Sequence, residues 1–286
     1  MTEPLPPLVS TQWLAERLGR AGLRIVDGSW YLPASGRDAA GEYAAGHLPG
    51  AVFFDLDASS DQTARLPHML PDADTFAARM ASLGLSDADD LIVYDGSGVN
   101  LSAARVWWMF RAFGHDRVAV LDGGSGKWRR EGRPLERGIP RVPERGGRFT
   151  PRRNQADVLD LEAVRAASST VQVADMRPAG RFAGTEPEPR AGLRGGHIPG
   201  SRNLPFTELV APDGTVLPPD QLRQRIAAAG IDLSRPLIAT CGSGTSACAL
   251  IHALHLIGHE RVTLYDGAWT EWGGRRDTPV ATGATG

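Results

Sequence analysis

The segment LIATCGSGTSA, residues 237–247, decides how the chain folds. Pro236 to Ala239 make a short apolar run, which predicts a buried strand. Cys241 follows after one residue and opens a turn rich in Gly, Ser and Thr. The residues that come next, 248–257, are apolar with a helical period. The segment therefore predicts a strand, a tight loop and a helix, with a thiol at the junction.

The loop after the thiol has the composition of an anion-binding turn. Gly242 and Gly244 let the backbone curl so that successive N–H groups point inward, and the following helix adds its positive end. A cysteine at the head of such a loop is expected to be a thiolate near neutral pH. We therefore interpret Cys241 as a nucleophile. The alternative is a buried, inert cysteine beside a simple turn, since free cysteines are often buried.

Composition limits the classes of protein that remain. The 286 residues suggest two domains, and the net charge of −2 gives no basic stripe for nucleic acid. The two cysteines cannot build a disulfide framework and indicate a reducing cytoplasm. The Pro-rich start has no signal-peptide pattern, and no apolar run approaches membrane-spanning length. We expect a cytoplasmic protein without membrane or nucleic-acid partners.

Apolar runs and helical periods alternate along the first half of the chain. Ser10 is a candidate N-cap for a helix that carries Trp13, Leu14 and Leu18. Further elements are expected as strands at 23–26, 91–94 and 118–121, and as helices at 73–83, 103–113 and 126–131. Strands that alternate with helices predict an α/β fold with a mainly parallel sheet.

The second half repeats the first. GHLPG at 46–50 is matched by GHIPG at 196–200, and the run 90–98 by 235–244. GHDRVAVLDG at 114–123 is matched by GHERVTLYDG at 258–267, and Trp128 by Trp272. Three blocks in one order at a near-constant offset indicate two duplicated domains.

The repeat divides the chain and separates its two copies by chemistry. We expect an N-terminal domain at 8–131, a Pro-, Gly- and Arg-rich linker at 132–155, a C-terminal domain at 156–277 and a flexible tail at 278–286. Asp95 stands in the first copy where Cys241 stands in the second, so only the C-terminal domain is expected to be catalytic. His47 and His197 occur in both copies and are expected to be scaffold.

These motifs together resemble the rhodanese superfamily in its two-domain form, over roughly residues 8–277. The loop CGSG at 241–244 is similar to that of 3-mercaptopyruvate sulfurtransferases, whereas thiosulfate sulfurtransferases typically carry basic residues just after the cysteine. The longest match is GRFAGTEPEPR at 180–190. Further matches are WYLP at 30–33, FFDLD at 53–57, HMLP at 68–71 and RVWWMFRAFG at 105–114. One departure is Thr245-Ser246, where the family usually has Val-Thr. We expect this difference to affect the turnover rate more than the type of reaction.

The resemblance implies a sulfurtransferase made of two tandem rhodanese-like domains. Cys241 would attack the sulfur of 3-mercaptopyruvate, form a cysteine persulfide and release pyruvate. The loop N–H groups would stabilise the negative sulfur, and they belong to the residues Gly242, Ser243, Gly244, Thr245, Ser246 and Ala247.

Other residues acquire roles from the same resemblance. Arg181 and Arg190 would bind the carboxylate of the donor, although from spacing alone they could equally be two solvated loop arginines. Ser243, His68 and Asp57 would form a relay in which Asp57 fixes the His68 tautomer, or His68 is merely structural. Because His68 and Asp57 belong to the first copy, this site would lie between the two domains.

Other residues of these segments have different expected roles. Thr185, Glu186 and Glu188 are expected to shape the arginine loop rather than touch substrate. Cys248 is expected in the core, with a redox partnership to Cys241 as the minor alternative.

Three other classes compete with this interpretation. A phosphatase of related fold needs an arginine at the end of the loop, where Ala247 and Cys248 stand. A non-enzymatic rhodanese-like module would be expected to lack the cysteine. Thiosulfate:cyanide sulfurtransferase activity is the serious alternative, since only the donor differs.

No metal-ligand cluster, P-loop or dinucleotide fingerprint is visible, so we predict no metal and no cofactor. The sulfur acceptor stays open between thioredoxin, cyanide, a small thiol and a downstream sulfur carrier. A monomer is expected because the two repeats already pair within one chain.

Overall fold

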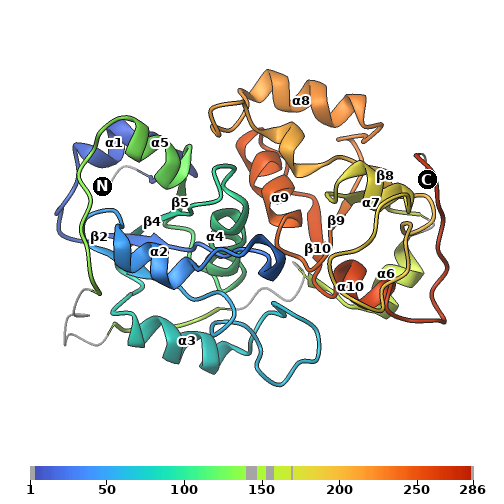
Figure 1. The fold of residues 1–286 in the computed structure, drawn as a ribbon, viewed down its shortest axis with the longest axis horizontal. Helices are drawn as coiled ribbons and strands as arrows, with labels where there is room; N and C mark the ends of the chain where they lie inside the picture. Colours follow the sequence, from blue (N-terminus) through green and yellow to red (C-terminus); the bar gives the residue numbers. More distant parts are fainter. Residues whose placement is uncertain (1–3, 140–146, 153–157, 169, 285–286) are drawn as a thin grey trace. The chain divides into compact units, whose positions relative to one another are not determined.

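The structure is a computed structural model that describes residues 4–139, 147–152, 158–168 and 170–284. Its described residues form two compact units. The first takes those of Met1–Gln62, Leu70–Asn154 and Pro212–Val216; the second takes those of Thr63–Met69, Gln155–Ala211 and Leu217–Gly286. Figure 1 shows each unit as a sheet with helices packed around it. The expected linker at 132–155 lies partly outside the described residues.

The first unit contains a parallel sheet of five strands in the order β1-β5-β4-β2-β3. The central strand, β4, pairs Leu91 with Val118 of β5 and with Arg24 of β2. Its strands are β1 (Leu8–Val9), β2 (Leu23–Asp27), β3 (Ala51–Phe53), β4 (Asp90–Tyr94) and β5 (Val118–Leu121), and its helices are α1 (Thr11–Ala15), α2 (Ala39–Ala45), α3 (Ala73–Ser82), α4 (Leu101–Ala112) and α5 (Gly124–Arg130), with a short 3₁₀ turn at Pro33–Ser35.

The second unit repeats this topology with the strand order β6-β10-β9-β7-β8, again with every strand pair parallel. Each strand thus takes the place of its counterpart in the first sheet. The strands are β6 (Val158–Leu159), β7 (Gln172–Asp175), β8 (Arg202–Asn203), β9 (Leu237–Thr240) and β10 (Val262–Tyr265), and the helices are α6 (Leu161–Ala167), α7 (Ala179–Ala183), α8 (Pro219–Ala228), α9 (Ala247–Leu256) and α10 (Ala268–Trp272), with a 3₁₀ turn at Phe206–Leu209. The α/β fold and the duplication predicted from the sequence are confirmed.

Local sequence accounts for where the elements begin. The Ser10 side chain accepts a hydrogen bond from Trp13 N, as predicted, and Asp72 and Asp160 cap α3 and α6 in the same way. The strand predicted at 118–121 has those bounds, and the helices predicted at 73–83, 103–113 and 126–131 appear with ends shifted by one or two residues.

The Gly-His-X-Pro-Gly histidines hold the scaffold in both units. His47 and His197 are buried, and each places Nδ1 2.9 Å from a backbone oxygen, of Tyr43 and Phe182 respectively. The His47 ring stacks on Tyr43 at 4.1 Å, and the His197 ring stacks on Phe182 at 3.7 Å. The two histidines make equivalent contacts in the two units, which agrees with the interpretation that they are scaffold residues.

The end of the chain differs from the flexible tail expected at 278–286. His197 N donates to Ala281 O at 2.9 Å, and Ala281 N donates to His197 O at 3.0 Å, which forms an antiparallel bridge. Thr278 is buried, and Trp272 Nε1 donates to Pro279 O at 2.7 Å. Residues 278–284 are therefore docked on the second unit. The small, Gly-containing composition led to the prediction of a flexible tail, because composition does not show which backbone groups pair.

Part of the expected linker is attached to the first unit by a similar antiparallel bridge. Glu136 and His47 form an antiparallel bridge through two hydrogen bonds of 2.9 Å. Phe149 is buried and packs edge-on against Phe76 with ring centroids 5.4 Å apart. The described parts of 132–155 are thus attached to the first unit.

The thiol loop follows from the sheet order. β9 lies between β10 and β7, and its carboxyl end leads into the loop that begins at Cys241. In parallel sheets the carboxyl ends of the strands are where ligands bind. Among the described residues, the structure contains no helix that is both long and apolar enough to cross a membrane.

We predict that ending the chain after Asp277 destabilises the second unit. This removes three backbone hydrogen bonds, two at Ala281 and one from Gly283 N to Ala183 O, together with the buried Thr278. At about 1 kcal/mol for each bond, the free energy of unfolding should fall by about 3 kcal/mol, measured by urea denaturation. A chain that ends after Gly283 is the control and should keep its stability; equal stability of both truncations would contradict the docking.

Candidate active site

Cys241 sits at the end of β9, and its backbone is tied to the start of α10. The Cys241 carbonyl accepts a hydrogen bond from Trp269 N at 2.9 Å. The next carbonyl, of Gly242, accepts from Thr270 N at 2.9 Å and from Thr270 Oγ1 at 2.6 Å. The thiol is buried, with 1% of the residue exposed. Two successive carbonyls are thereby fixed, so the N–H groups of the same two peptides, those of Gly242 and Ser243, point away from α10.

The loop N–H groups are available for an anion. Within the described part of the loop, the first backbone N–H that donates inside the protein is that of Cys248, to Thr245 O at 3.2 Å. Gly244 has φ 77°, a left-handed conformation that glycine adopts without strain. The N–H groups of residues 242–247 can therefore serve a ligand at the thiol.

The sister loop of the first unit shows that this fold can surround a negative charge. Asp95 takes the place of Cys241 and is fully buried. Its carboxylate accepts hydrogen bonds from Ser97 N at 2.8 Å, Ser97 Oγ at 2.6 Å and Ala103 N at 2.8 Å. Its backbone oxygen accepts from Ser125 N at 3.0 Å, as that of Cys241 accepts from Trp269 N. The two loops are built alike, and one of them holds an anion.

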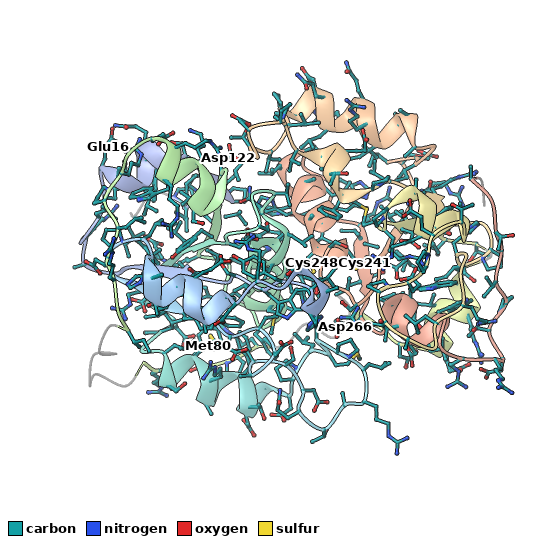
Figure 2. The ribbon with its side chains drawn as sticks, in the orientation of Figure 1. Glu16, Met80, Asp122, Cys241, Cys248 and Asp266 are labelled. Carbon is teal, nitrogen blue, oxygen red and sulfur yellow. The ribbon has the colours of Figure 1, made fainter. Side chains whose placement is uncertain are left out.

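Cys248 lies in the first turn of α9 and is buried (Figure 2). Its Sγ donates to Gly244 O at 3.3 Å. It belongs to the core of the second unit, as the sequence predicted.

Arg181 reaches the thiol loop from α7. A Cβ added at Gly242 would lie 3.1 Å from Arg181 Nη2, so the guanidinium stands beside the first residue after Cys241. Arg181 donates to Glu188 Oε2 from Nε at 3.1 Å and from Nη2 at 2.6 Å. The arginine is thus oriented by a carboxylate within its own loop. Glycine at 242 leaves room for it.

Glu188 links Arg181 to a buried ion-pair chain. Its Oε1 accepts from Arg177 Nη1 at 2.6 Å, and Arg177 also pairs with Asp175 at 2.7 Å. The side chains of Asp175, Arg177 and Glu188 are at most 2% exposed. Burial opposes the charge on Arg177, but the carboxylates of Asp175 and Glu188 outweigh it and raise the pKa of this guanidinium. Positive and negative side chains alternate along this row of ion pairs, so each buried charge has a partner of opposite sign.

Sequence reasoning did not single out Arg177. The repeat carries the signal, because Asp27 and Asp175 end corresponding strands and each accepts a 2.9 Å hydrogen bond from the backbone N two residues later. That residue is Ser29 in the first copy and Arg177 in the second. A comparison of the copies at this position would have found it.

The remaining residues of the arginine loop have separate places. Thr185 Oγ1 donates to Gly180 O at 3.2 Å, so this side chain shapes the loop as expected. Glu186 is exposed. Arg190 is half-buried in the turn between α7 and β8, and its contact with a donor stays a prediction.

His68 is brought to the thiol loop. Its segment, Thr63–Met69, belongs to the second unit, although the sequence places it in the first copy. His68 Nδ1 lies 3.1 Å from Ser243 Oγ. Both residues are buried, as is the neighbouring Thr245. Asp57 belongs to the first unit, where its Oδ2 accepts from Trp30 Nε1 at 3.0 Å. The role of Asp57 beyond this bond stays a prediction.

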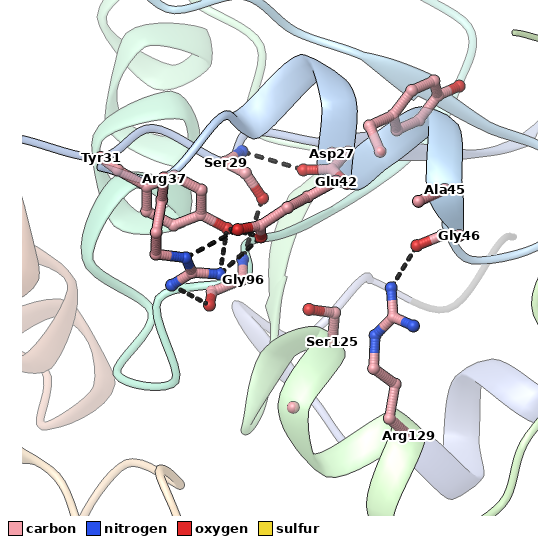
Figure 3. Close-up of a pocket in the computed structure, with 12 residues that line it drawn as sticks. Asp27, Ser29, Tyr31, Arg37, Glu42, Ala45, Gly46, Gly96, Ser125 and Arg129 are labelled. Carbon is pink, nitrogen blue, oxygen red and sulfur yellow. Dashed lines mark hydrogen bonds and ion pairs between the residues drawn. The ribbon is translucent and has the colours of Figure 1, made fainter. Parts of the chain in front are cut away.

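The space beside the first loop, which corresponds to the place of Arg181 in the second unit, is lined by different side chains. A pocket of about 350 Å³ lies there at the carboxyl ends of β2 and β4 (Figure 3). Arg37 stacks on the Tyr31 ring at 3.7 Å and pairs with Glu42, to which the Tyr31 hydroxyl also donates at 2.8 Å. A Cβ at Gly96 would clash with the Tyr31 hydroxyl. Tyr31 therefore stands beside the first loop glycine where Arg181 stands in the second unit.

Electrostatics also separate the two places. The hydrogen bond from Arg37 lowers the pKa of Glu42, and burial raises the pKa of Asp27. Asp95, at the head of the first loop, is held by hydrogen bonds from Ser97 and Ala103, so this loop already surrounds a side chain of its own. Only the second unit combines a loop without an internal anion, a cysteine and Arg181.

No group of three or more His, Cys, Asp or Glu side chains that could hold a metal ion occurs among the described residues.

Comparisons with known proteins agree with this geometry. The family model described as a rhodanese-like domain matches residues 10–131 and 160–275. The human protein named 3-mercaptopyruvate sulfurtransferase is 46% identical over 272 residues, which cover 93% of this chain and 91% of that protein. Bovine thiosulfate sulfurtransferase is 42% identical over 271 residues, covering 93% and 91%. The crystal structure of SseA from Escherichia coli, a 3-mercaptopyruvate sulfurtransferase by its description, matches with a TM-score of 0.84 and 41% identity, covering 92% of this chain and 98% of that one.

We predict that Glu188→Gln destabilises the second unit and loosens Arg181. The amide keeps the shape of the side chain but removes the negative charge that pairs with the guanidinium groups of Arg177 and Arg181. Removing one partner of such a pair should lower the free energy of unfolding by about 3 kcal/mol, measured by urea denaturation. Glu186→Gln makes the same change at an exposed position of the same loop and should shift it by less than about 0.5 kcal/mol. Equal effects of the two variants would contradict the role of Glu188.

Proposed function

We propose, because this chain belongs to the rhodanese family of two-domain sulfurtransferases, that its donor is 3-mercaptopyruvate and that Cys241 carries the sulfur as a persulfide. The observation that carries the proposal is the position of Cys241 at the head of a loop whose counterpart in the first unit, together with the start of α4, donates hydrogen bonds to the carboxylate of Asp95. A site that stabilises an anion at this point suits both a thiolate and a persulfide anion.

The first half-reaction forms one sulfur–sulfur bond and breaks one carbon–sulfur bond. The Cys241 thiolate attacks the sulfur of 3-mercaptopyruvate, and the electron pair of the carbon–sulfur bond stays on carbon as pyruvate enolate. A proton then converts the enolate to pyruvate. The persulfide left on Cys241 is the covalent intermediate that divides the transfer into two steps.

The second half-reaction returns the enzyme to its starting state. A thiol or cyanide attacks the outer sulfur of the persulfide, the sulfur–sulfur bond breaks, and Cys241 leaves as a thiolate. The products are an acceptor persulfide or thiocyanate. Thioredoxin is one thiol that fits this step. We propose that the enzyme works in the cytoplasm, in keeping with its two cysteines, and as a monomer, because the chain already contains two repeats.

Two arginines would recognise the carboxylate of the donor. Arg181 is oriented by Glu188 through Nε and Nη2, which leaves Nη1 and the second Nη2 hydrogen for a ligand. Arg190 lies in the same loop and would complete the clamp. Planar guanidinium groups match a planar carboxylate through paired hydrogen bonds.

Ser243 would serve the donor sulfur or its proton. Its hydroxyl is two residues from Cys241 and 3.1 Å from His68 Nδ1. In this proposal His68 passes the proton and Asp57 fixes its tautomer.

Thiosulfate is the alternative donor, and the bovine thiosulfate sulfurtransferase is a relative at 42% identity. The same Cys241 persulfide would form from it. The uncharged Gly242-Ser243 pair after the cysteine favours a carboxylate donor, because thiosulfate carries two negative charges that basic side chains at these positions would balance.

We predict that kcat/KM is higher with 3-mercaptopyruvate than with thiosulfate, measured with cyanide as the acceptor for both. Arg190→Ala should lower the value for 3-mercaptopyruvate by about 10- to 100-fold, because a charge-assisted hydrogen bond contributes roughly 1.5–3 kcal/mol. Arg223→Ala, which removes an exposed arginine of α8, is the matched control and should leave both values unchanged. A preference for thiosulfate, or a preference for 3-mercaptopyruvate that Arg190→Ala does not reduce, would overturn the assignment of the donor.

We also predict that Cys241→Ser abolishes sulfur transfer while Cys248→Ser retains it. Serine at 248 keeps a donor for Gly244 O, whereas serine at 241 is a poor nucleophile toward sulfur. Mass spectrometry of the wild type after 3-mercaptopyruvate should show one added sulfur on the peptide that contains residue 241. Sulfur found at Cys248 instead would refute the role of Cys241.

A further inference from the structure

The first unit contains a pocket that the proposed sulfur transfer does not use. Its volume is about 350 Å³, and it lies at the carboxyl ends of β2 and β4 (Figure 3). Parallel α/β sheets bind their ligands at this edge, and pockets of this volume hold small molecules. The thiol loop lies at the corresponding edge of the second sheet, so both copies offer a site in the same place of the fold.

Two serines stand in the first unit where the second unit has an arginine and a tryptophan. Ser29 corresponds to Arg177, because each donates its backbone N–H to the aspartate two residues earlier. Ser125 corresponds to Trp269, because each donates its backbone N–H to the carbonyl at the head of its loop. In the second unit the Arg177 guanidinium lies 4.3 Å from the centroid of the Trp269 ring, and both residues are buried. The two serines line the pocket, so the first unit has open space where the second is filled by large side chains.

Asp27 lines this pocket and differs from its counterpart in the kind of partner it has. In the second unit, Asp175 pairs with the Arg177 guanidinium at 2.7 Å. In the first, Ser29 takes the place of that arginine and brings no charge to the carboxyl of Asp27, which is 4% exposed. Burial raises the pKa of Asp27. A cationic group of a ligand would offset this burial cost, as the guanidinium does for Asp175.

Arg129 brings a positive charge to the same pocket from α5. It donates to Gly46 O, and among the residues that the structure describes it forms no ion pair. The hydrogen bond from Arg37 is the main cause that lowers the pKa of Glu42, and the charge of Arg129 contributes, so its field reaches the pocket. Arg37 and Glu42 pair with each other at 2.5 Å, and their charges cancel. Arg129 therefore keeps hydrogen-bond donors and a charge for an anionic group of a ligand.

We propose that this pocket binds a small zwitterion of the α-amino acid class, with its ammonium group at Asp27 and its carboxylate at Arg129. An amine without a carboxylate would leave the charge of Arg129 unbalanced, and a carboxylate without an amine would bring no cation to Asp27. The Ser125 hydroxyl also lines the pocket and can donate to the carboxylate or accept from the ammonium group. Each charge of the ligand then meets the opposite charge within one unit. This site goes beyond the proposed sulfur transfer and does not depend on it.

Calorimetric titration of the full chain with L-alanine, L-serine and L-methionine tests this site. At least one of these amino acids should bind at one site per chain. Propionate and ethylamine, which carry only the carboxylate and only the amine of alanine, should bind about 10- to 100-fold more weakly than the amino acid that binds best, because each loses one charge-assisted contact. No binding by any of the three amino acids, or equal binding by propionate or ethylamine, would overturn the proposal.

Four variants place the binding in this pocket. Ser125→Trp introduces the side chain that the second unit has at this position and should abolish binding. Asp27→Asn and Arg129→Met each remove one charge and should weaken amino-acid binding about 10- to 100-fold. Arg130→Met is the matched control, because this exposed neighbour on α5 does not line the pocket, and it should leave binding unchanged.

Sulfur transfer from 3-mercaptopyruvate, a reaction of the second unit, checks that each variant is folded. Amino-acid binding that survives both Ser125→Trp and Arg129→Met would overturn the proposed site. A wild type that binds an amino acid but transfers no sulfur would overturn the proposed function instead, which keeps the two failures apart.

Discussion

The attachment of the thiol loop to the helix after the next strand is the constraint on which the site depends. Cys241 O and Gly242 O accept hydrogen bonds from Trp269 N and Thr270 N, so the chain leaves β9 in one direction only. The first unit has the same attachment from Ser125 N to Asp95 O. A peptide N–H points away from the carbonyl of the same peptide, so the fixed carbonyls of Cys241 and Gly242 also fix the N–H groups of Gly242 and Ser243. In the first loop the N–H that corresponds to that of Ser243 belongs to Ser97 and donates to the Asp95 carboxylate. Preorganised donors of this kind stabilise charge without rearrangement during the reaction.

The two copies use this loop for opposite purposes. In the first, the loop closes on the carboxylate of its own Asp95, and Tyr31, Arg37 and Glu42 occupy the space beside it. In the second, Cys241 brings no carboxylate into the loop, and Arg181 stands beside it. The same backbone is therefore self-satisfied in one unit and open to an anionic ligand in the other. The two copies differ at the head of the loop, where Asp95 corresponds to Cys241, and beside the loop, where Tyr31 stands in the place of Arg181.

The sequence was sufficient for those features that depend on local pattern. Apolar runs and helical periods located the strands and helices, and the repeat predicted two equivalent sheets. It also singled out Cys241 and Ser243, because a cysteine before a Gly/Ser turn has a recognisable composition. Arg177 was missed, since a buried arginine is unusual and its two carboxylate partners lie 2 and 11 residues away. The docked tail at Ala281 was missed because a bridge to His197 is a long-range pairing that composition does not encode.

The buried ion pairs hold Arg181 in one orientation while keeping the arginine loop, residues 180–190, close to neutral in charge. Asp175, Arg177, Glu188 and Arg181 alternate in sign, so their formal charges cancel and no buried ion is left uncompensated. Arg181 is consequently oriented before any donor arrives, and less side-chain entropy is lost on binding. The same cancellation reduces the net attraction that Arg181 alone exerts on an anion. In the proposed function, discrimination between donors therefore depends on the geometry of the paired hydrogen bonds and on a second positive charge in the same loop, the place that Arg190 occupies in the sequence.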